Sequence, residues 1–294
     1  MIKVGLLGGS GLVGQTYQKL VQKHPLFELV FMPKREELKD LSKAKECEFI
    51  FSALPNEIAK EVDPLYAQAG FGVFSSASCF RMERDIPLII PEINPEHFSL
   101  IETQKKNRGW KGFIVSKPNC TLQGMLLPLF PLHKKYGLKG VLVTYLQSRS
   151  GAGKDFKLDE SILPFIEGEE EKSSMETHKI LGDDKIAISA QCLRVPVSVG
   201  HMATISAKFH QKPSLDEIAL LWEQSAGVRY FLDQNRPTHF QDLNGGMDVS
   251  VGRLRSCPLM DIKFISLSHN LIRGAAGGGI ATLEQYLKTM EYAC

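Results

Sequence analysis

Cysteine 120 is the residue whose surroundings most clearly indicate chemistry. An extended stretch at 113–116 ends before Pro118, and a helical pattern begins at Asn119 or Cys120. A thiol at a helix start lies near open N–H groups and the positive end of the helix dipole, which favour the thiolate by lowering the thiol pKa. The same N–H groups can hold an oxyanion on a carbonyl that the sulfur attacks. A buried cysteine without a chemical role is the alternative interpretation.

Two residues farther along the chain could assist such a thiol. Arg194 and His201 lie seven positions apart, and Pro196 and Gly200 between them allow the chain to bend. A histidine can take and return a proton, and an arginine can bind a carboxylate through two hydrogen bonds. Considered singly, a satisfied strand histidine and a surface or interface cation are the more common interpretations.

Other charged residues could bind a small ionic substrate. Glu169 and Lys172 share one face of a predicted helix, and this pair would suit an ammonium and a phosphate. A solvated charged face is the default interpretation. Arg81 follows a loop of small residues at 75–79, where a doubly wound sheet would place an anion site.

A glycine-rich turn near the N-terminus indicates dinucleotide binding. It joins a predicted strand at 2–7 to a predicted helix at 12–22, and a second strand at 27–32 follows at the spacing of a βαβ unit. Glycines there allow a tight turn and close approach of the backbone to a pyrophosphate at the helix N-terminus. The predicted cofactor-binding residues of this turn are Gly8, Ser10, Gly11, Leu12, Val13 and Gly14.

The end of the second predicted strand bears on the kind of cofactor. It reads Pro33-Lys34-Arg35, and two cations favour the 2′-phosphate of NADP. Glu36 and Glu37 follow directly and could instead bind the ribose hydroxyl of NAD, and a solvated charged loop is as plausible. We predict NADP(H), bound in part by Lys34 and Arg35.

The order of predicted elements gives the fold class: a doubly wound parallel (Rossmann) α/β sheet plus an α+β second domain with a mostly antiparallel sheet. Strands and helices alternate up to Cys120, and long strands dominate after it. A glycine-rich segment at 274–279 then leads into a helix that could return to the first domain. We predict a dinucleotide-binding domain at 1–120 plus 269–294 and a catalytic and dimerisation domain at 121–268.

In the first region we expect strands at 47–53, 72–75, 87–90 and 112–116 and a helix at 57–69. In the second we expect strands at 139–147, 185–193, 201–209, 247–254 and 260–268, with helices at 169–181 and 215–226, before a last helix at 280–290.

Composition excludes several classes of protein. The chain has 294 residues, of which 43% are hydrophobic and 23% charged, and its formal net charge is +2. It lacks the basic patch of a nucleic-acid-binding protein, a run long enough to span a membrane and a recognisable signal peptide. Its six cysteines show no C-x-x-C spacing for zinc or a redox disulfide. We expect a cytoplasmic protein without a bound metal, nucleic acid or membrane.

Taken together, these segments resemble the aspartate-semialdehyde dehydrogenases, specifically their archaeal and fungal-type branch. The similarity spans nearly the whole chain and rests on the order of its motifs more than on any one of them. The segments that carry it are Gly8–Gly14, Arg81 before 85–97, Pro118–Thr121, Ser150–Gly153, 166–172, 176–181, Arg194–Val197 with Gly200-His201, 248–253 and 268–278.

The resemblance implies NADPH-dependent reductive dephosphorylation of L-aspartyl 4-phosphate to L-aspartate 4-semialdehyde through a cysteine thioester. This step serves the biosynthesis of lysine, diaminopimelate, threonine and methionine. It implies partners as well, namely the small-molecule substrate, phosphate and further copies of the chain in a homodimer or homotetramer. The implied roles are Cys120 as nucleophile, His201 as acid/base, Gln147 orienting the acyl-enzyme, Arg194 and Glu169 binding the substrate carboxylate and ammonium, Arg81, Lys172 and Asn119 at the phosphate or substrate, and Ser150, Gly151 and Asn270 at the cofactor.

The chain departs from the family pattern at several points. Lys117 stands where the family usually has asparagine, and Cys79-Phe80 replaces polar residues before Arg81. The chain is also short, mainly between its second strand and Cys47, and the usual 2′-phosphate turn is replaced by Pro33-Lys34-Arg35. Another acyl-phosphate reductase, such as N-acetyl-glutamyl-phosphate reductase, and a non-catalytic redox- or nucleotide-sensing protein are the competing functions.

Overall fold

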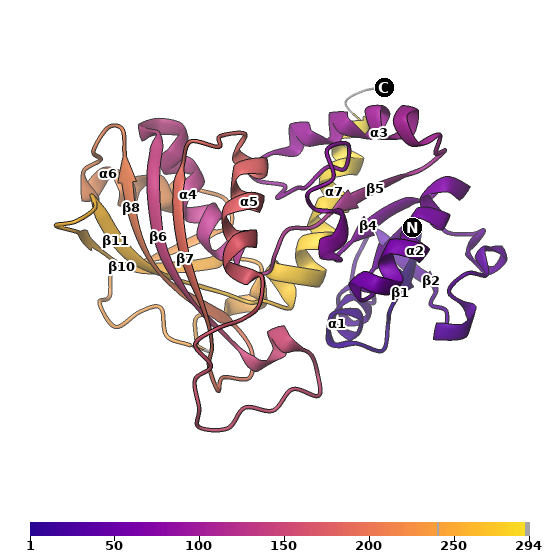
Figure 1. The fold of residues 1–294 in the computed structure, drawn as a ribbon, viewed down its shortest axis with the longest axis horizontal. Helices are drawn as coiled ribbons and strands as arrows, with labels where there is room; N and C mark the ends of the chain where they lie inside the picture. Colours follow the sequence, from indigo (N-terminus) through magenta and orange to yellow (C-terminus); the bar gives the residue numbers. More distant parts are fainter. Residues whose placement is uncertain (240, 292–294) are drawn as a thin grey trace. The chain divides into compact units, whose positions relative to one another are not determined.

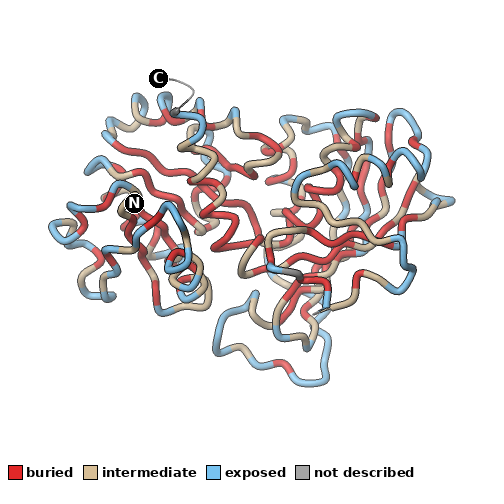
Figure 2. Tube along the Cα trace, turned by 180° about the vertical axis from the view of Figure 1, so that it is seen from behind, coloured by how far each residue is buried: buried red, intermediate tan, exposed pale blue. Residues whose placement is uncertain are grey.

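The computed structural model describes residues 1–239 and 241–291 and divides the chain into two compact units (Figure 1). The first unit comprises Met1–Pro118 and Ala275–Cys294, and the second comprises Asn119–Gly274. In each unit the strands are largely buried and the connecting loops largely exposed (Figure 2). The first unit is therefore built from two separate stretches of chain.

The first unit contains a five-stranded parallel sheet with the strand order β2-β1-β3-β4-β5. Connection through helices makes parallel pairing possible, because a parallel neighbour needs a long crossover. The order changes direction between β1 and β3, and ligands of such sheets bind beyond the carboxyl ends of the strands at this point. The elements are β1 (Ile2–Leu7), α1 (Leu12–Val21), β2 (Phe27–Phe31), β3 (Phe49–Ser52), α2 (Asn56–Ala69), β4 (Gly72–Ser75), α3 (Leu100–Arg108), β5 (Phe113–Ser116) and α7 (Gly277–Glu291).

Two hydrophobic clusters cover the two faces of this sheet. Ile50 and Val73 pack with Val62 of α2 on one face. Phe51 and Phe74 pack on the other face with residues of α1 and α7, and Ile280 and Leu283 represent α7 there. Since both faces are covered, the strands read as short apolar runs without alternation, as is typical of doubly wound sheets.

The second unit contains a six-stranded mixed sheet with the order β7-β6-β8-β11-β10-β9. Its three central pairings, β6 with β8, β8 with β11 and β11 with β10, are antiparallel, and the two outer pairings are parallel. Its elements are α4 (Leu122–Tyr136), β6 (Leu138–Gln147), α5 (Glu169–Leu181), β7 (Ala187–Arg194), β8 (His201–Phe209), α6 (Leu215–Gln224), β9 (Val228–Phe231), β10 (Val249–Ser256) and β11 (Ile262–Ser268).

Helices pack on one face of this second sheet. The indole N–H of Trp222, on α6, donates to the carbonyl of Pro128 on α4, and its ring packs against Phe264 of β11. The other face is more open, and Leu142 of β6 is 47% exposed there. This one-sided burial explains the alternating pattern of β8, in which every second residue is buried.

The structure confirms the predicted fold class and corrects individual elements. The expected strand at 87–90 is wrong: Leu88 makes only an isolated parallel bridge to Ser116, because Pro87 cannot donate to a ladder and Pro91 ends the segment. Helix α3 and strand β9 were not predicted. Helix α4 begins at Leu122, later than the expected start at Asn119 or Cys120.

Candidate functional site

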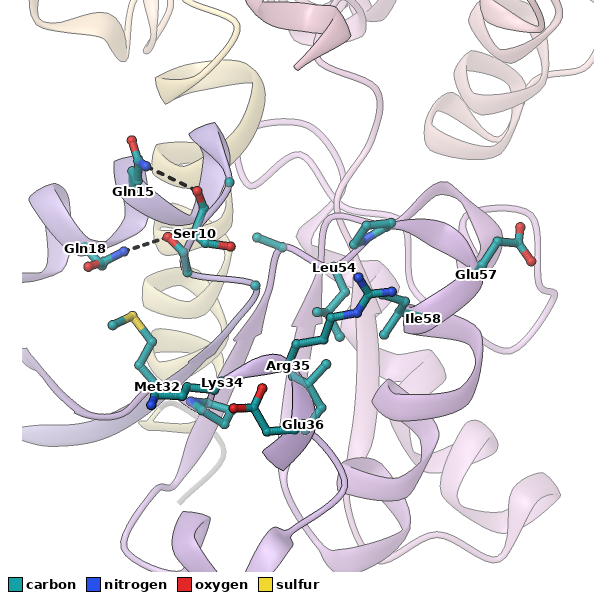
Figure 3. A pocket seen from close by; sticks show the side chains of 17 residues that line it. Ser10, Gln15, Gln18, Met32, Lys34, Arg35, Glu36, Leu54, Glu57 and Ile58 are labelled. Atoms are coloured by element: carbon teal, nitrogen blue, oxygen red, sulfur yellow. Dashed lines mark hydrogen bonds between the residues drawn. The ribbon is translucent and has the colours of Figure 1, made fainter. Parts of the chain in front are cut away.

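A cavity of about 1080 Å³ lies at the carboxyl ends of β1, β2 and β3 in the first unit (Figure 3). It is lined by the glycine turn at Gly8–Gly11, by Met32–Glu36 after β2 and by Ala53–Pro55 after β3. This is the edge at which the strand order changes direction. The cavity therefore occupies the position at which a doubly wound sheet binds its ligand.

The glycine turn is shaped by contacts that leave no room for side chains. A methyl group on Gly14 would lie 2.2 Å from the Gly8 carbonyl oxygen, whereas one on Gly11 would meet nothing closer than 3.8 Å. Gln15 and Gln18 hold the turn, because their side-chain amides donate to the carbonyls of Ser10 and Gly9 (Figure 3). Its backbone is thus fixed next to the first N–H groups of α1, which suit a phosphate.

The charged residues after β2 divide into two groups. Glu37 accepts from the backbone N–H of Lys34 at 3.2 Å and pairs with Lys43 at 2.6 Å, and the hydrogen bond from Lys43 is the largest of the effects that lower its pKa. Lys34, Arg35 and Glu36 line the cavity. Figure 3 shows the Arg35 side chain extending toward Leu54 and Ile58. Of the two acids that could bind the ribose hydroxyl, Glu37 is therefore already hydrogen-bonded within the protein, to the Lys34 N–H and to Lys43.

A thiol and an imidazole meet in the second unit. The Sγ atom of Cys120 lies 3.3 Å from Nε2 of His201. Cys120 stands just before Thr121, the N-cap residue of α4, and so lies one residue outside the position predicted for it. The N–H of Thr121 donates to the Asn119 side chain at 3.1 Å, so this helix-start donor is already engaged. Close contact with His201 at the start of β8 is the strongest local indication that this thiol is chemically active.

The imidazole of His201 is buried and neutral. Only 3% of the residue is exposed, and burial, assisted by the nearby Arg194 guanidinium, lowers the pKa of the imidazole to about 3. Its second nitrogen, Nδ1, receives the backbone N–H of Ser148 at 3.0 Å. The ring is thus held from both sides, and it faces the sulfur through Nε2.

Glu169, the first residue of α5, connects the polar side chains near the thiol. Its carboxylate accepts from the amides of Asn119 at 2.9 Å and Gln147 at 3.1 Å and from Lys172 at 2.9 Å. Burial alone would raise the pKa of Glu169, but the hydrogen bonds from Asn119 and Lys172 outweigh it and hold the pKa below its usual value. The Glu169 carboxylate is therefore stable in its ionised form, and it is hydrogen-bonded to Asn119, the residue before Cys120.

Arg194, at the end of β7, lies beside the imidazole. Its guanidinium donates to the Ser148 carbonyl at 2.9 Å, and burial lowers its pKa. A methyl group on Gly151 would lie 2.5 Å from Nη1 of Arg194 and 3.3 Å from Nε2 of His201. Because residue 151 is a glycine, no side chain crowds Nη1 of Arg194 or Nε2 of His201 from this side.

Asn270, which is buried, and Ser150, which is partly buried, belong to a polar network that reaches Nδ1 of His201 through Ser148. The Asn270 amide donates to Ser150 Oγ at 2.9 Å and accepts the backbone N–H of Gly200 at 2.8 Å. Ser148 Oγ lies 3.1 Å from Ser150 Oγ and 3.3 Å from His201 Nδ1. Ser150, Gly151 and Asn270, which the family resemblance assigns to the cofactor, thus lie in the second unit, on the side of the imidazole that faces away from the thiol or at its edge.

The residues that remain belong to the first unit. Leu12, Val13 and Gly14 form the first turn of α1, directly after the cavity-lining Gly11, and do not line the cavity themselves. Arg81 belongs to the first unit, is 8% exposed and donates to the Ser76 carbonyl. Lys117 donates to the carbonyl of Pro118.

Sequence reasoning missed several residues that shape these sites. Gln15 and Gln18 give no sequence signal of this role, because polar side chains are common on a helix surface, and Ser148 stands in a loop of small residues without a distinctive pattern. Ala53, Leu54 and Pro55 carried a usable signal, since they directly follow a buried strand of a parallel sheet. Strand ends of that kind converge on one edge.

Within residues 1–239 and 241–291, no group of three or more His, Cys, Asp or Glu side chains could hold a metal ion. Across the same residues, no helix is both long and apolar enough to cross a membrane.

Family models match both parts of the chain. A semialdehyde dehydrogenase NAD-binding domain matches residues 34–101, and a semialdehyde dehydrogenase dimerisation domain matches residues 129–273. The first match covers β3, β4 and the segment after β2. The second covers most of the unit that holds the Cys120–His201 contact.

Individual relatives match over nearly the full length. An aspartate-semialdehyde dehydrogenase of Archaeoglobus fulgidus is 38% identical, with 97% of this chain and 98% of the relative covered. A malonyl CoA reductase (NADP) of Metallosphaera sedula is 31% identical, with 96% of each covered. The crystal structure of the Candida albicans aspartate semialdehyde dehydrogenase with NADP superposes with a TM-score of 0.87 at 30% identity, covering 98% of this chain and 99% of that one. The alignment with the Archaeoglobus protein runs to 336 residues, more than the 294 of this chain, so the relative carries additional segments. The chain belongs to the aspartate-semialdehyde dehydrogenase family of oxidoreductases.

Proposed function

We propose that this protein reduces L-aspartyl 4-phosphate to L-aspartate 4-semialdehyde with NADPH, through a thioester on Cys120. The observation that carries the proposal is the 3.3 Å contact between Cys120 Sγ and His201 Nε2, surrounded by the Glu169 carboxylate and the Arg194 guanidinium. A thiol next to an imidazole is suited to form an acyl-enzyme, and the two opposite charges suit a substrate that carries both an ammonium and a carboxylate.

Each residue near the thiol has a proposed task. Cys120 attacks the acyl carbon and phosphate leaves, so that the substrate becomes a thioester; hydride addition then gives a thiohemiacetal, which collapses to the aldehyde and the free thiolate. Arg194 binds the substrate carboxylate and Glu169 its ammonium. Gln147, tied to Glu169 at 3.1 Å, orients the acyl group. Asn119, Lys172 and Arg81 serve the phosphate or substrate, and the first two bind Glu169.

The first unit has the features needed to hold NADP(H). Bound NADPH supplies the hydride for the reduction. The glycine turn offers backbone N–H groups to a pyrophosphate. The turn is tightly packed, since a methyl group on Gly14 would lie 2.2 Å from the Gly8 carbonyl oxygen. Lys34 and Arg35 line the cavity and provide cations for the 2′-phosphate, while Glu37 is engaged by Lys43. We assign dinucleotide binding to 1–118 with 275–294, and catalysis and dimerisation to 119–274.

The proposal also covers the oligomeric state of the protein and its place in the cell. The second unit exposes large apolar side chains, with Phe165 at 63%, Met175 at 47% and Leu142 at 47% exposure, and it matches a dimerisation domain. These favour a homodimer or a homotetramer, in which such side chains are covered. We place the enzyme in the cytoplasm, in the pathway to lysine, diaminopimelate, threonine and methionine.

The test is turnover in the reverse direction. Aspartate semialdehyde, phosphate and NADP should yield NADPH, followed by absorbance, and NAD should serve less well. Cys120→Ser should abolish the reaction. Activity of the Cys120→Ser variant near that of the wild type would rule out the covalent mechanism.

A second candidate follows from the Metallosphaera relative, whose name gives malonyl-CoA as its substrate. Malonyl-CoA lacks the ammonium for which Glu169 is proposed. Forward assays with malonyl-CoA, N-acetyl-glutamyl phosphate and aspartyl phosphate therefore separate the three reductases. Preference for either of the first two would overturn the aspartyl assignment.

A further inference from the structure

Glu176 is a glutamate in the buried face of α5. The buried residues of this helix are Ser173, Glu176, Thr177 and Ile180, at the i, i+3, i+4, i+7 spacing of a packed helix face. Only 1% of Glu176 is exposed. A carboxylic side chain is rarely buried so deeply unless hydrogen bonds hold it. Glu176 thus occupies a position that packing alone would give to an apolar residue.

The carboxylate of Glu176 binds the residue directly before the thiol. Its Oε2 atom accepts the backbone N–H of Asn119 at 2.7 Å, although 57 positions separate the two residues in sequence. This distance lies at the short end of the range for N–H donors, as is typical of a carboxylate acceptor. Asn119 is only 4% exposed, so its N–H depends on an acceptor inside the protein.

The other polar groups of Asn119 are also bound. Its side-chain amide donates to Glu169 at 2.9 Å, its side-chain oxygen accepts the N–H of Thr121 at 3.1 Å, and its carbonyl accepts the N–H of Leu122 at 3.2 Å. Glu169 and Glu176 are seven positions apart, about two turns of helix, and therefore lie on the same side of α5. One helix thus fixes both the main chain and the side chain of Asn119.

Cys120 itself has little room to move. A Cβ atom on Gly274 would lie 2.7 Å from Cys120 Cβ and 2.8 Å from the Cys120 carbonyl oxygen. The glycine is therefore in close contact with the cysteine backbone. The 3.3 Å contact of Sγ with His201 Nε2 depends on this backbone, because a single rotatable bond places the sulfur.

We propose that Glu176 is a positioning residue, which accepts the Asn119 N–H, fixes the backbone that carries Cys120 and so holds Sγ against His201, the proposed acid/base. This role rests on the function proposed for Cys120 and adds a residue that acts on the reaction only through Asn119. Displacement of a reacting atom by about 1 Å can lower a rate by about 10²-fold. The role needs an acceptor oxygen, whereas Glu169 needs a charge for the substrate ammonium.

Removal of the acceptor is the direct test. Glu176→Leu lacks both oxygens and fills most of the buried space, so it should lower kcat of the reverse reaction by about 10²-fold. KM for aspartate semialdehyde should stay within about twofold, since the groups proposed to bind it are unchanged. Glu176→Gln keeps an acceptor oxygen and should retain kcat within about threefold of the wild type. Equal losses in the two folded variants, or an unchanged kcat in Glu176→Leu, would overturn the proposal.

Glu170 offers a matched control on the same helix. Its Oε1 atom also accepts a backbone N–H, that of Cys192 on β7 at 3.0 Å. Glu170→Ala removes this bond and leaves Asn119 held, so kcat should stay close to that of the wild type. Circular dichroism and denaturant unfolding establish that the compared variants are folded. A loss as large as that of Glu176→Leu would show that docking of α5 in general sets the rate, against the specific role of Glu176.

Alkylation of the thiol gives a readout that needs no substrate. Modification of Cys120 by iodoacetamide, followed by mass spectrometry of its peptide, should be about tenfold slower in Glu176→Leu, because the sulfur is no longer held at the imidazole. Glu176→Gln should react as the wild type does, and equal rates in all three proteins would contradict the proposal. If the wild type reduces none of the substrates but alkylation follows the expected order, the proposed function fails while the positioning role stands.

A second substitution tests the same backbone if Glu176→Leu does not fold. Gly274→Ala adds a methyl group 2.7 Å from Cys120 Cβ and displaces the thiol while Glu176 stays in place. It should give the same result, a fall in kcat of about 10²-fold with KM retained and alkylation slowed. A folded Gly274→Ala enzyme with the kcat of the wild type would show that turnover tolerates movement of this backbone, and the proposal would then be wrong.

Discussion

The site of the first unit is formed mainly by the backbone, whereas the site of the second unit is formed by side chains. The cavity of the first unit is made by backbone shape: a glycine turn, two glutamines that hold its carbonyls and three strand ends on one edge. The cluster of the second unit is made by buried side chains that bind one another, from Asn119 to Asn270. Substitutions that add atoms to the glycine turn should therefore impair the first site by steric clash. Substitutions that remove a functional group should impair the second site.

The largest expected effect is loss of the nucleophile. Cys120→Ala should lower kcat by about 10⁴-fold or more, because no other group near His201 can form the thioester. NADP affinity and the free energy of unfolding should stay close to those of the wild type, measured by fluorescence titration and denaturant unfolding. Cys257→Ser, in the β10–β11 turn, is the control and should retain full activity. Substantial turnover by Cys120→Ala would place the reactive group elsewhere.

The glycine turn offers a sharper contrast within one site. A methyl at Gly14 would lie 2.2 Å from the Gly8 carbonyl oxygen and 2.6 Å from Gly9 Cα, so Gly14→Ala should destabilise the protein by about 3 kcal/mol. At Gly11 the nearest atom is 3.8 Å away, so Gly11→Ala should leave the free energy of unfolding within about 0.5 kcal/mol of the wild type. If a pyrophosphate lies against Gly11, this stable variant should still lose NADP affinity about tenfold.

Denaturant unfolding and NADP titration of the same two variants complete that experiment. A Gly11→Ala variant that binds NADP as well as the wild type would show that the ligand does not approach the turn. A Gly14→Ala variant of normal stability would mean that the backbone of the turn can yield.

Cofactor choice should depend on the cations after β2. Arg35→Ala should raise KM for NADP by about 10- to 100-fold, because a charge-assisted hydrogen bond to the 2′-phosphate is lost, and should leave KM for NAD nearly unchanged. Lys43→Ala removes a nearby cation that pairs with Glu37 instead of lining the cavity, and it should not alter the preference. Equal changes for both cofactors in Arg35→Ala would argue for contact with the adenine or ribose instead of the phosphate.

The same contrast explains what the sequence could predict. The turn at Gly8–Gly14, its strand and its helix are adjacent in sequence, so spacing alone located them. The contacts of Glu169 with Asn119 and of Ser148 with His201 join residues about 50 positions apart. The pairing of β6 with β8 brings Ser148 to His201, and tertiary packing brings the start of α5 to Asn119. Family order could suggest these residues one by one. It could not show that Asn270 lies behind His201, or that Glu169 holds Gln147.

Local propensity also failed where tertiary context decides. A helix was predicted to begin at Asn119 or Cys120, but Pro128 and Pro131 gave no indication that it would continue; the helix runs through both, because 10 of its 15 residues are buried. Strand β9 pairs with β10 in parallel at the sheet edge, and its four residues are only partly buried. So short and weakly patterned a segment gives little periodicity from which a strand could be predicted.

Two carboxylates, the partly buried Glu169 and the fully buried Asp63, give the smallest and most specific test of the comparison. Glu169 receives a lysine and two amides, and its pKa is lowered. Asp63, on α2 of the first unit, receives only the hydroxyls of Ser52 at 2.8 Å and Ser75 at 2.7 Å, and burial raises its pKa to about 6. An acid whose pKa is higher in the folded than in the unfolded state stabilises the fold fully below the unfolded value. That contribution is lost as pH rises to the folded value.

Asp63→Asn should therefore stabilise the protein at about pH 7.5, by an amount of order 1–3 kcal/mol, and have little effect near pH 4. The amide can still accept from one serine and donate to the other, so the hydrogen bonds are retained. Asp85 supplies the opposite sign in the same unit: a hydrogen bond from Arg108 is the largest effect lowering its pKa, so Asp85→Asn should destabilise at neutral pH and lose this effect in acid. Denaturant unfolding across pH measures both. A uniform loss of stability in Asp63→Asn at every pH would mean that the ionised carboxylate is favourable there, and the first unit would then stabilise its buried charge as the second does.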